Sequence, residues 1–443
     1  MQQLTRFFLA ALLLMQACTP SRQLGTDNYQ PFLQDSAFEQ AHLGVAVYNA
    51  TAGRWVLQQN SRKYFVPASN IKLPTLYAGL KYLGDSLVSF YYQKNQDTLH
   101  LLANGDPSFL HPDFKAHPSY DFLRHQEGII VLHGTNWKTE PLGYGWSWSD
   151  YLSYYSAERS PMPVYGNVVK WVQERVVEQK GMHTDTSLFL YTEPEVQWEV
   201  KFSMENTGSF RVTRPRTENY YTIESGTGMN HSAEVPFVTN GFRATVDFLK
   251  DTLYKEPELS NEPMDEKNIR PVFSQSTDSL LRIMMHRSDN FYAEQVLLMV
   301  SNRLLGFMDE QKLIDTVLKT TLAGFPQQPR WVDGSGLSRY NLFSPEDFVW
   351  LLGKLKEEFG LERIKNILPA GNQGTLRNYY VEEGSSLFAK TGTLSGCVAL
   401  SGYIISDKGQ LLLFSVLVNN HNTSAATIRR AVERLLKEVK RRN

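Results

Sequence analysis

The segment Pro67–Pro74, with the sequence PASNIKLP, places a hydroxyl and an amine three residues apart at the start of a helical pattern. Residues i and i+3 of a helix lie on one face, so Ser69 and Lys72 are expected to be neighbours. At a helix start, the free backbone amides of the first turn would surround the serine oxygen. An acyl-transfer enzyme needs such a nucleophile, a base beside it and donors for the oxyanion. In isolation the pattern is more typical of a Ser N-cap followed by an exposed Lys.

The residues before this segment predict a β-hairpin. His42–Tyr48 reads as one strand, 51–53 as a turn, and Trp55–Leu57 as the start of a second strand. The helix continues through leucines at helical spacing, Leu76, Leu80 and Leu83. A hairpin that runs into this helix would place Ser69 at the end of a sheet.

Two further motifs lie far along the chain. Ser288-Asp289-Asn290 falls between two helical patterns, where a plain helix N-cap is the alternative interpretation. Lys390-Thr391-Gly392 precedes two strand-like runs, 398–405 and 411–418, and a closing amphipathic helix that extends to about Lys440. Asp333–Ser338 (DGSGLS) lacks the setting of an α/β-hydrolase elbow, so we interpret Ser335 as a turn residue.

In this order, Ser69-x-x-Lys72, Ser288-x-Asn290 and Lys390-Thr391-Gly392 form the three-part signature of penicillin-recognising serine enzymes. The chain resembles the low-molecular-mass class C penicillin-binding proteins, the D-alanyl-D-alanine carboxypeptidase/endopeptidase group. The resemblance covers essentially the whole chain after residue 40, and it extends to the segments 67–72, 104–108, 288–294, 333–339 and 389–396.

The resemblance implies an α+β fold, with a penicillin-binding/β-lactamase-like transpeptidase domain made of an antiparallel sheet flanked by helices. The long separation of Lys72 from Ser288 is typical of an insertion in this group, whereas class A β-lactamases keep these motifs close. We therefore expect a catalytic domain in 41–90 and 231–443, and a mostly β inserted domain in 91–230. Residues 18–40 are polar and are expected to be a tether.

The resemblance assigns the catalytic roles residue by residue. Ser69 would attack the carbonyl between two D-alanines, and Lys72 would take its proton. Lys72 must then be a neutral amine, which burial and a nearby cation such as Lys390 would favour. Ser288 would relay a proton to the leaving amine, and Asn290 would orient Lys72 and the substrate amide.

The substrate-binding roles follow from the third motif. Lys390 and Thr391 would hold the terminal carboxylate, and Gly392 would let the substrate approach an edge strand because no side chain intervenes. The backbone amides of Ser69 and Thr393 would form the oxyanion hole, worth roughly 3–4 kcal/mol per donor.

The N-terminus has the pattern of an export signal. A short, positively charged start is followed by the apolar run Phe7–Met15, which is too short to span a bilayer. The residues before Cys18 resemble a bacterial lipobox, which predicts a lipoprotein signal peptide in 1–17 and lipidation of Cys18; a plain signal peptide is the alternative. The one other cysteine, Cys397, leaves no disulfide framework and is expected to be a small apolar strand residue.

The amino-acid composition excludes some classes of binding partner. With 45 basic and 46 acidic residues, the net charge of −1 gives no bulk attraction to nucleic acid. The histidine spacings match no zinc pattern, so we expect no metal or other cofactor and interpret four histidines as surface or turn residues: His111, His117, His125 and His133.

The resemblance implies a penicillin-sensitive serine D-Ala-D-Ala carboxypeptidase. Its partners would be peptidoglycan stem peptides, β-lactam antibiotics and, through the N-terminal lipid, a bacterial membrane of the cell envelope or periplasm. An additional endopeptidase activity would cleave D-Ala–diaminopimelate cross-links. Two alternatives remain open at this point: a catalytically idle peptidoglycan- or β-lactam-binding sensor on the same fold, and a β-lactamase.

Overall fold

The computed structural model describes residues 25–443, apart from 181–182, 204–207 and 266. The predicted signal peptide and Cys18 lie outside the described residues. Within the described part of the chain, no helix combines the length and the apolar character needed to cross a bilayer.

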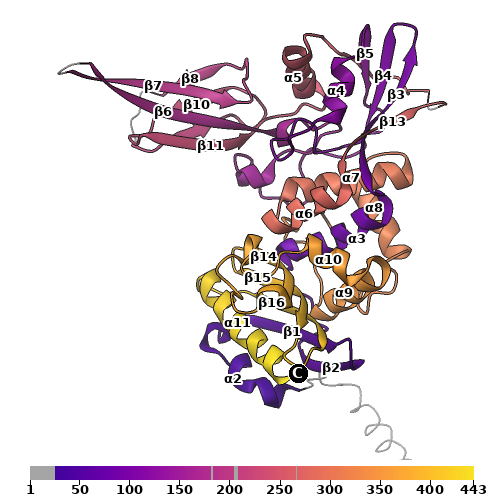
Figure 1. The fold of residues 1–443 in the computed structure, drawn as a ribbon, viewed down its shortest axis with the longest axis vertical. Helices are drawn as coiled ribbons and strands as arrows, with labels where there is room; N and C mark the ends of the chain where they lie inside the picture. The colour runs from indigo at the N-terminus through magenta and orange to yellow at the C-terminus, as the bar shows by residue number, and fades with distance from the viewer. Residues whose placement is uncertain (1–24, 181–182, 204–207, 266) are drawn as a thin grey trace, which may run out of the picture.

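A five-stranded antiparallel sheet forms the lower part of the molecule (Figure 1), in the order β14-β15-β16-β1-β2. Its strands are β1 (His42–Asn49), β2 (Arg54–Gln59), β14 (Leu387–Leu394), β15 (Cys397–Ile405) and β16 (Leu411–Asn419). The central strands are buried on both faces because helices cover each side. The N-terminal hairpin and the C-terminal strands thus share one sheet through the pairing of β1 with β16, and β14, the strand of the third motif, forms the edge opposite β2.

Helix α11 (Ala425–Arg442) covers one face of this sheet. Its apolar stripe, Ile428, Val432, Leu435, Leu436 and Val439, is buried against the strands. Helix α9 (Pro345–Phe359) packs on the opposite face and also contacts the helix that begins at Lys72. The α+β class predicted from the sequence is confirmed by this layered arrangement.

A layer of helices lies above the sheet (Figure 1). It contains α3 (Lys72–Tyr82), α6 (Thr277–Arg287), α7 (Asn290–Leu305), α8 (Glu310–Lys319) and α10 (Leu361–Ile367). Helix α3 is almost entirely buried and packs closely on α7. Both helices begin at a predicted motif, so their packing brings the first two motifs together.

The inserted segment occupies the upper part of Figure 1 and holds three further sheets. A five-stranded mixed sheet has the order β12 (Glu258–Ser260), β5 (Ile129–His133), β4 (Thr98–Ala103), β3 (Ser86–Asn95), β13 (Arg270–Ser276), with α4 (Pro118–Arg124) and α5 (Arg243–Leu253) nearby. Two three-stranded sheets follow: β11 (Asn230–Pro236), β6 (Val168–Lys180) and β7 (His183–Glu193), and β8 (Val200–Phe202), β10 (Tyr221–Glu224) and β9 (Arg211–Thr213).

The boundaries of the insert differ from those expected. Strand β13 pairs with β3, and β11 pairs with β6, so residues after 230 complete the sheets of the insert. We therefore place the insert between about Ser86 and Ser276 rather than at 91–230. The periodicity of α5 resembles that of the core helices, and sequence alone could not show that it packs on the sheets of the insert.

Two other expectations are corrected for the described residues. Residues 25–40 are not a loose tether, because Tyr29, Leu33 and Phe38 are buried against α11 and the sheet. His111 and His133 are buried rather than on the surface, the latter within β5. Tertiary packing buried these positions, and neither lies in a periodic pattern that signals it. Cys397, in contrast, is a buried strand residue as expected.

Candidate active site

Ser69 and Lys72 lie in one tight helical turn. The 3-10 helix η3 (Ala68–Ile71) leads directly into α3, and residues three apart in a 3-10 turn lie above one another. The Lys72 amine is fully buried, and its Nζ lies 3.1 Å from Ser69 Oγ. Ser69 makes no capping bond to the helix, so the alternative of a Ser N-cap with an exposed Lys does not describe this segment.

The contacts of Lys72 serve both of its protonation states, because an ammonium ion can donate to all three neighbours and a neutral amine to two of them. Nζ lies 2.6 Å from Asn290 Oδ1 and 2.7 Å from the carbonyl oxygen of Ser335, and both of these atoms can only accept. A neutral amine has two N–H groups, and these two acceptors use both. The nitrogen lone pair is then left for the hydroxyl proton of Ser69, which is the geometry of a general base.

Burial lowers the pKa of Lys72 to about 8, against the opposing effect of Asp289, Asp333 and Glu294. The burial that the sequence interpretation required is therefore present. The two lysines also repel each other: burial first, and then the charges of Lys72 and Arg429, hold the pKa of Lys390 well below its usual value.

The second motif lies at the junction of α6 and α7. Ser288 has the positive φ of 60° that ends α6, and Asp289 caps α7 by accepting from the backbone N–H of Tyr292. The N-cap alternative is thus correct for Asp289, while its neighbours face the lysines. Asn290 Nδ2 donates to the carbonyl oxygen of Tyr155 at 2.9 Å, which directs Oδ1 towards Lys72.

The third motif is on β14, an edge strand of the sheet. Lys390 is fully buried, and its Nζ lies 2.8 Å from Ser288 Oγ and 2.6 Å from the carbonyl oxygen of Thr391. The Thr391 hydroxyl donates to Thr375 Oγ1 at 2.7 Å. Ser69, Lys72 and Asn290 thus form one hydrogen-bonded group, and Ser288 and Lys390 form a second one; together they make up a polar cluster in which the two lysines interact through their charges.

Strand β14 runs close to the Ser69 turn. A Cβ added to Gly392 would lie 2.8 Å from the carbonyl oxygen of Pro67 and 3.1 Å from the backbone nitrogen of Ser69, so only glycine allows this approach. The backbone N–H of Ala389 points away from β15, towards Pro369. Because backbone direction alternates along a strand, the N–H of Thr393 also points to this open edge, where η3 lies.

Three groups of the site carried no recognised role in the sequence. The Ser335 carbonyl binds Lys72; the adjacent Gly336, with a φ of +84°, lies so close that an added Cβ would be 2.0 Å from the Ala68 carbonyl oxygen. Arg429 of α11 donates from Nη2 to Thr393 Oγ1 at 2.6 Å. Glu294, fully buried beneath the cluster, accepts from the backbone N–H of Ser335. Of these groups, only the Ser335 turn had a signal in the sequence, the Gly-rich composition of residues 333–338.

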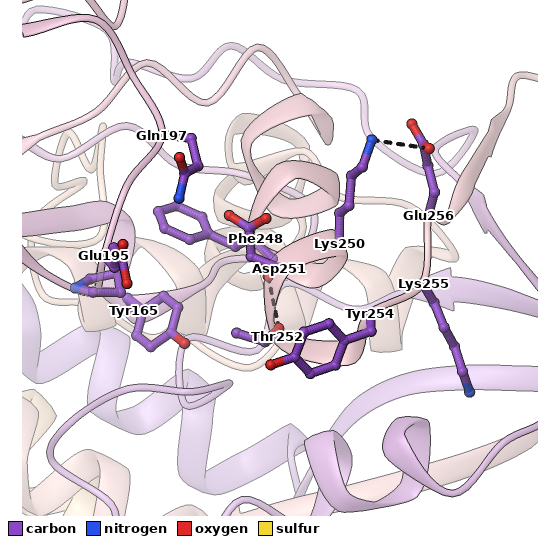
Figure 2. Close-up of a pocket in the computed structure, with 11 residues that line it drawn as sticks. Tyr165, Glu195, Gln197, Phe248, Lys250, Asp251, Thr252, Tyr254, Lys255 and Glu256 are labelled. Carbon is purple, nitrogen blue, oxygen red and sulfur yellow. Dashed lines mark hydrogen bonds and ion pairs between the residues drawn. The ribbon is translucent and has the colours of Figure 1, made fainter.

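A pocket of about 690 Å³ lies elsewhere, in the insert beside the end of α5 (Figure 2). Its lining includes Tyr165, Tyr254 and the ion pair of Lys250 with Glu256, whose charged atoms are 3.1 Å apart. The Thr252 hydroxyl there donates to the backbone of its own helix. None of the predicted site residues lines this pocket, and no serine or cysteine is among its lining residues.

Comparison with known proteins identifies the family of the chain. Residues 26–439 match the family model of the D-Ala-D-Ala carboxypeptidase 3 (S13) family. The D-alanyl-D-alanine carboxypeptidase of Actinomadura sp. (strain R39) is 25% identical over 444 residues, which cover 90% of this chain and 81% of the relative. The D-alanyl-D-alanine endopeptidase of Haemophilus influenzae is 28% identical over 153 residues, 34% of this chain and 49% of that relative.

The fold also has solved counterparts. The crystal structure of penicillin binding protein 4 from Haemophilus influenzae superposes with a TM-score of 0.74 at 19% identity, covering 94% of this chain and 99% of that one. A second structure of that protein, in complex with a β-lactam, gives a TM-score of 0.70. At these identities the likeness concerns the fold.

Proposed function

The chain belongs to the D-Ala-D-Ala carboxypeptidase 3 (S13) family, and we propose that it carries out this family's reaction at Ser69, through an acyl-enzyme. It is a serine-type D-Ala-D-Ala carboxypeptidase that acts on peptidoglycan stem peptides. The observation that supports Ser69 most strongly is the buried amine of Lys72, whose hydrogen bonds to two pure acceptors leave its lone pair for the Ser69 hydroxyl.

The acylation step follows from these contacts. Lys72 accepts the proton of the Ser69 hydroxyl as Oγ attacks the carbonyl between the two D-alanines. The negative charge on the carbonyl oxygen is stabilised by the backbone N–H groups of Ser69 and Thr393. The intermediate collapses when the amine of the terminal D-Ala leaves, and that amine takes a proton delivered from Lys72 by way of Ser288.

Deacylation reverses the order. Water attacks the ester and gives one proton to Lys72, which passes it to Ser69 Oγ as the ester bond breaks. The new carboxyl group loses the second proton to solvent, so the shortened peptide leaves as a carboxylate. Asn290 keeps Lys72 in place in both steps, because the carbonyl of Tyr155 fixes the direction of its amide.

The terminal carboxylate would bind where the third motif meets α11. Thr391 and Thr393 share one face of β14, and Arg429 reaches that face from α11. The Lys390 amine, whose pKa is lowered by burial and neighbouring cations, gains charge more readily when an anion approaches. Carboxylate binding and protonation of Lys390 therefore support each other.

Removing the guanidinium by Arg429→Ala is expected to weaken substrate and penicillin capture. A charge-assisted hydrogen bond of this kind contributes roughly 1.5–3 kcal/mol, so the second-order rate of penicillin acylation should fall by about tenfold or more. The control is Arg441→Ala, on the same helix but paired with Glu438. Equal rates for R429A and the control would exclude Arg429 from carboxylate recognition.

The function is tested by mass spectrometry of purified stem pentapeptides after incubation with the protein. We expect release of one D-Ala per peptide, and inhibition by penicillin. Cleavage of cross-linked muropeptides between D-Ala and diaminopimelate would add the endopeptidase activity. Acylation without release of D-Ala would instead identify a sensor, and rapid penicillin hydrolysis would identify a β-lactamase.

The place of action is the cell envelope, in keeping with a cell-wall peptidase family. We further propose that the protein is held there by a lipid on Cys18, because the residues before it resemble a lipobox. Metabolic labelling with a radioactive fatty acid should mark the wild-type protein and not the Cys18→Ser variant. Labelling of neither protein would leave a plain signal peptide as the explanation of the N-terminus.

A further inference from the structure

Two buried carboxylates hold the turn that contacts Lys72. Glu294 Oε1 accepts from the backbone N–H of Ser335 at 2.8 Å, and Asp333 Oδ1 accepts from that of Gly336 at 2.9 Å. The peptide groups before and after Ser335 are therefore each fixed at their N–H. The carbonyl of the second group is the one that accepts from Lys72 at 2.7 Å.

The insert reaches both carboxylates. Arg159 Nη1 lies 3.4 Å from Glu294 Oε2 and 3.1 Å from Glu310 Oε1, and its side chain is only 1% exposed. Trp146 Nε1 donates to Asp333 Oδ2 at 3.0 Å. A buried guanidinium is costly unless it is paired, so Arg159 is held firmly by these carboxylates.

Arg159 and Trp146 belong to one ordered piece of the insert. The Arg159 guanidinium donates to the carbonyl of Glu140 at 2.8 Å, and its backbone N–H donates to that of Pro141 at 2.7 Å. The guanidinium also lies 5.7 Å from the centre of the Trp146 ring. Tyr155, between them in sequence, supplies the carbonyl that orients Asn290. This part of the insert therefore acts on both hydrogen-bond acceptors of Lys72. It contacts the two carboxylates that hold the Ser335 turn, and it orients Asn290 directly.

We propose that Glu294 is a positioning residue of the peptidase reaction: with Arg159 of the insert, it holds the Ser335 carbonyl against Lys72, so that the insert sets the geometry of the catalytic base. The proposal rests on the function assigned above. It gives the 139–160 segment of the insert a role in catalysis, beyond any contact it makes with substrate.

Charge gives this role a measurable consequence. The charge of Glu294 raises the pKa of Lys72, so removing that charge lowers it. Burial and Asp333 raise the pKa of Glu294 itself to about 7, against the effect of Arg159. Five charged groups face this pair: Asp289, Arg159, Glu310, Asp333 and Lys390.

The test is the pH dependence of acylation by labelled penicillin, measured on the full-length protein as wild type and as Glu294→Gln. The amide of Gln can still accept from the Ser335 N–H but carries no charge. Lys72 must be neutral to act, so a lower pKa moves the acid limb of the profile to lower pH, by about half a unit to one unit. The looser turn should also reduce the rate on the plateau by roughly three- to tenfold.

Glu433→Gln is the matched control. Glu433 is likewise buried, accepts from a backbone N–H, that of Tyr380 at 2.7 Å, and pairs with an arginine, Arg430 at 2.6 Å, but it lies on α11 away from Lys72. It should have a similar stability cost and an unchanged pH profile. An acid limb in E294Q that coincides with that of wild type above about pH 7, where Glu294 carries its charge, would overturn the proposal, whatever happens to the plateau.

Arg159→Met tests the part played by the insert. If Arg159 acts through Glu294, the two substitutions should be strongly non-additive in the acylation rate, and additive effects would overturn that part. The double variant R159M/E294Q removes the pair together, and it replaces E294Q in the pH measurement if E294Q does not fold. Failure of the wild-type protein itself to acquire label would count against the proposed function, and is thus distinguishable from failure of this inference.

Discussion

Replacement of Ser69 by alanine is expected to abolish the covalent penicillin adduct and the release of D-Ala. The only hydroxyl within reach of the buried Lys72 amine in the described structure is that of Ser69, at 3.1 Å. Without the oxygen no ester can form, and the remaining groups could give only a small residual rate from binding and the oxyanion donors. The backbone N–H of residue 69 is retained, so the variant should still bind substrate.

Fluorescent penicillin followed by gel electrophoresis measures this result, with the adduct located by peptide mass spectrometry. Ser335→Ala is the control, because that serine lies in the Gly-rich turn but contributes its carbonyl, which alanine keeps. It should still acquire label at Ser69. A labelled S69A protein would end the assignment of the nucleophile, and label at Ser335 in the wild type would replace it.

Removal of the base by Lys72→Met is expected to lower the acylation rate by at least about a thousandfold, since general base catalysis alone contributes 10²–10⁴ and the hydrogen bonds that place Asn290 are also lost. Methionine fills most of the volume of the lysine stem, so the fully buried site should not collapse. Lys81→Met, on the same helix but exposed and paired with Glu358, is the matched control and should keep the wild-type rate.

The pH profile of the wild type gives an independent measurement of the same base. Lys72 acts when neutral, and burial lowers its pKa to about 8. The acylation rate should therefore rise with pH and level off above about 8, falling by about tenfold per pH unit on the acidic side. A flat profile between pH 6 and 9 would mean that Lys72 is not the group whose deprotonation controls the reaction.

Much of the site could be predicted from local spacing. The Ser69–Lys72 pair is three residues apart in a helical pattern, and a helical turn brings such residues together whatever surrounds them. The α+β fold and the family followed from the order of three short motifs. The limits of the insert could not be predicted, because the pairing of β13 with β3 joins residues that are far apart in sequence and carry no mutual signal.

The amino-acid sequence by itself determined which groups are available: a hydroxyl, two lysines, a serine–asparagine pair and a glycine where strand and turn must touch. Only the tertiary structure decided their protonation and direction. The pKa of the Lys72 amine is lowered because α3 is buried against α7. In the neutral amine the lone pair is left for Ser69, because Asn290 Oδ1 and the Ser335 carbonyl oxygen accept hydrogen bonds from its two N–H groups. Burial and direction depend on residues that are distant in sequence, such as Arg159 and Glu294, and no local pattern records them.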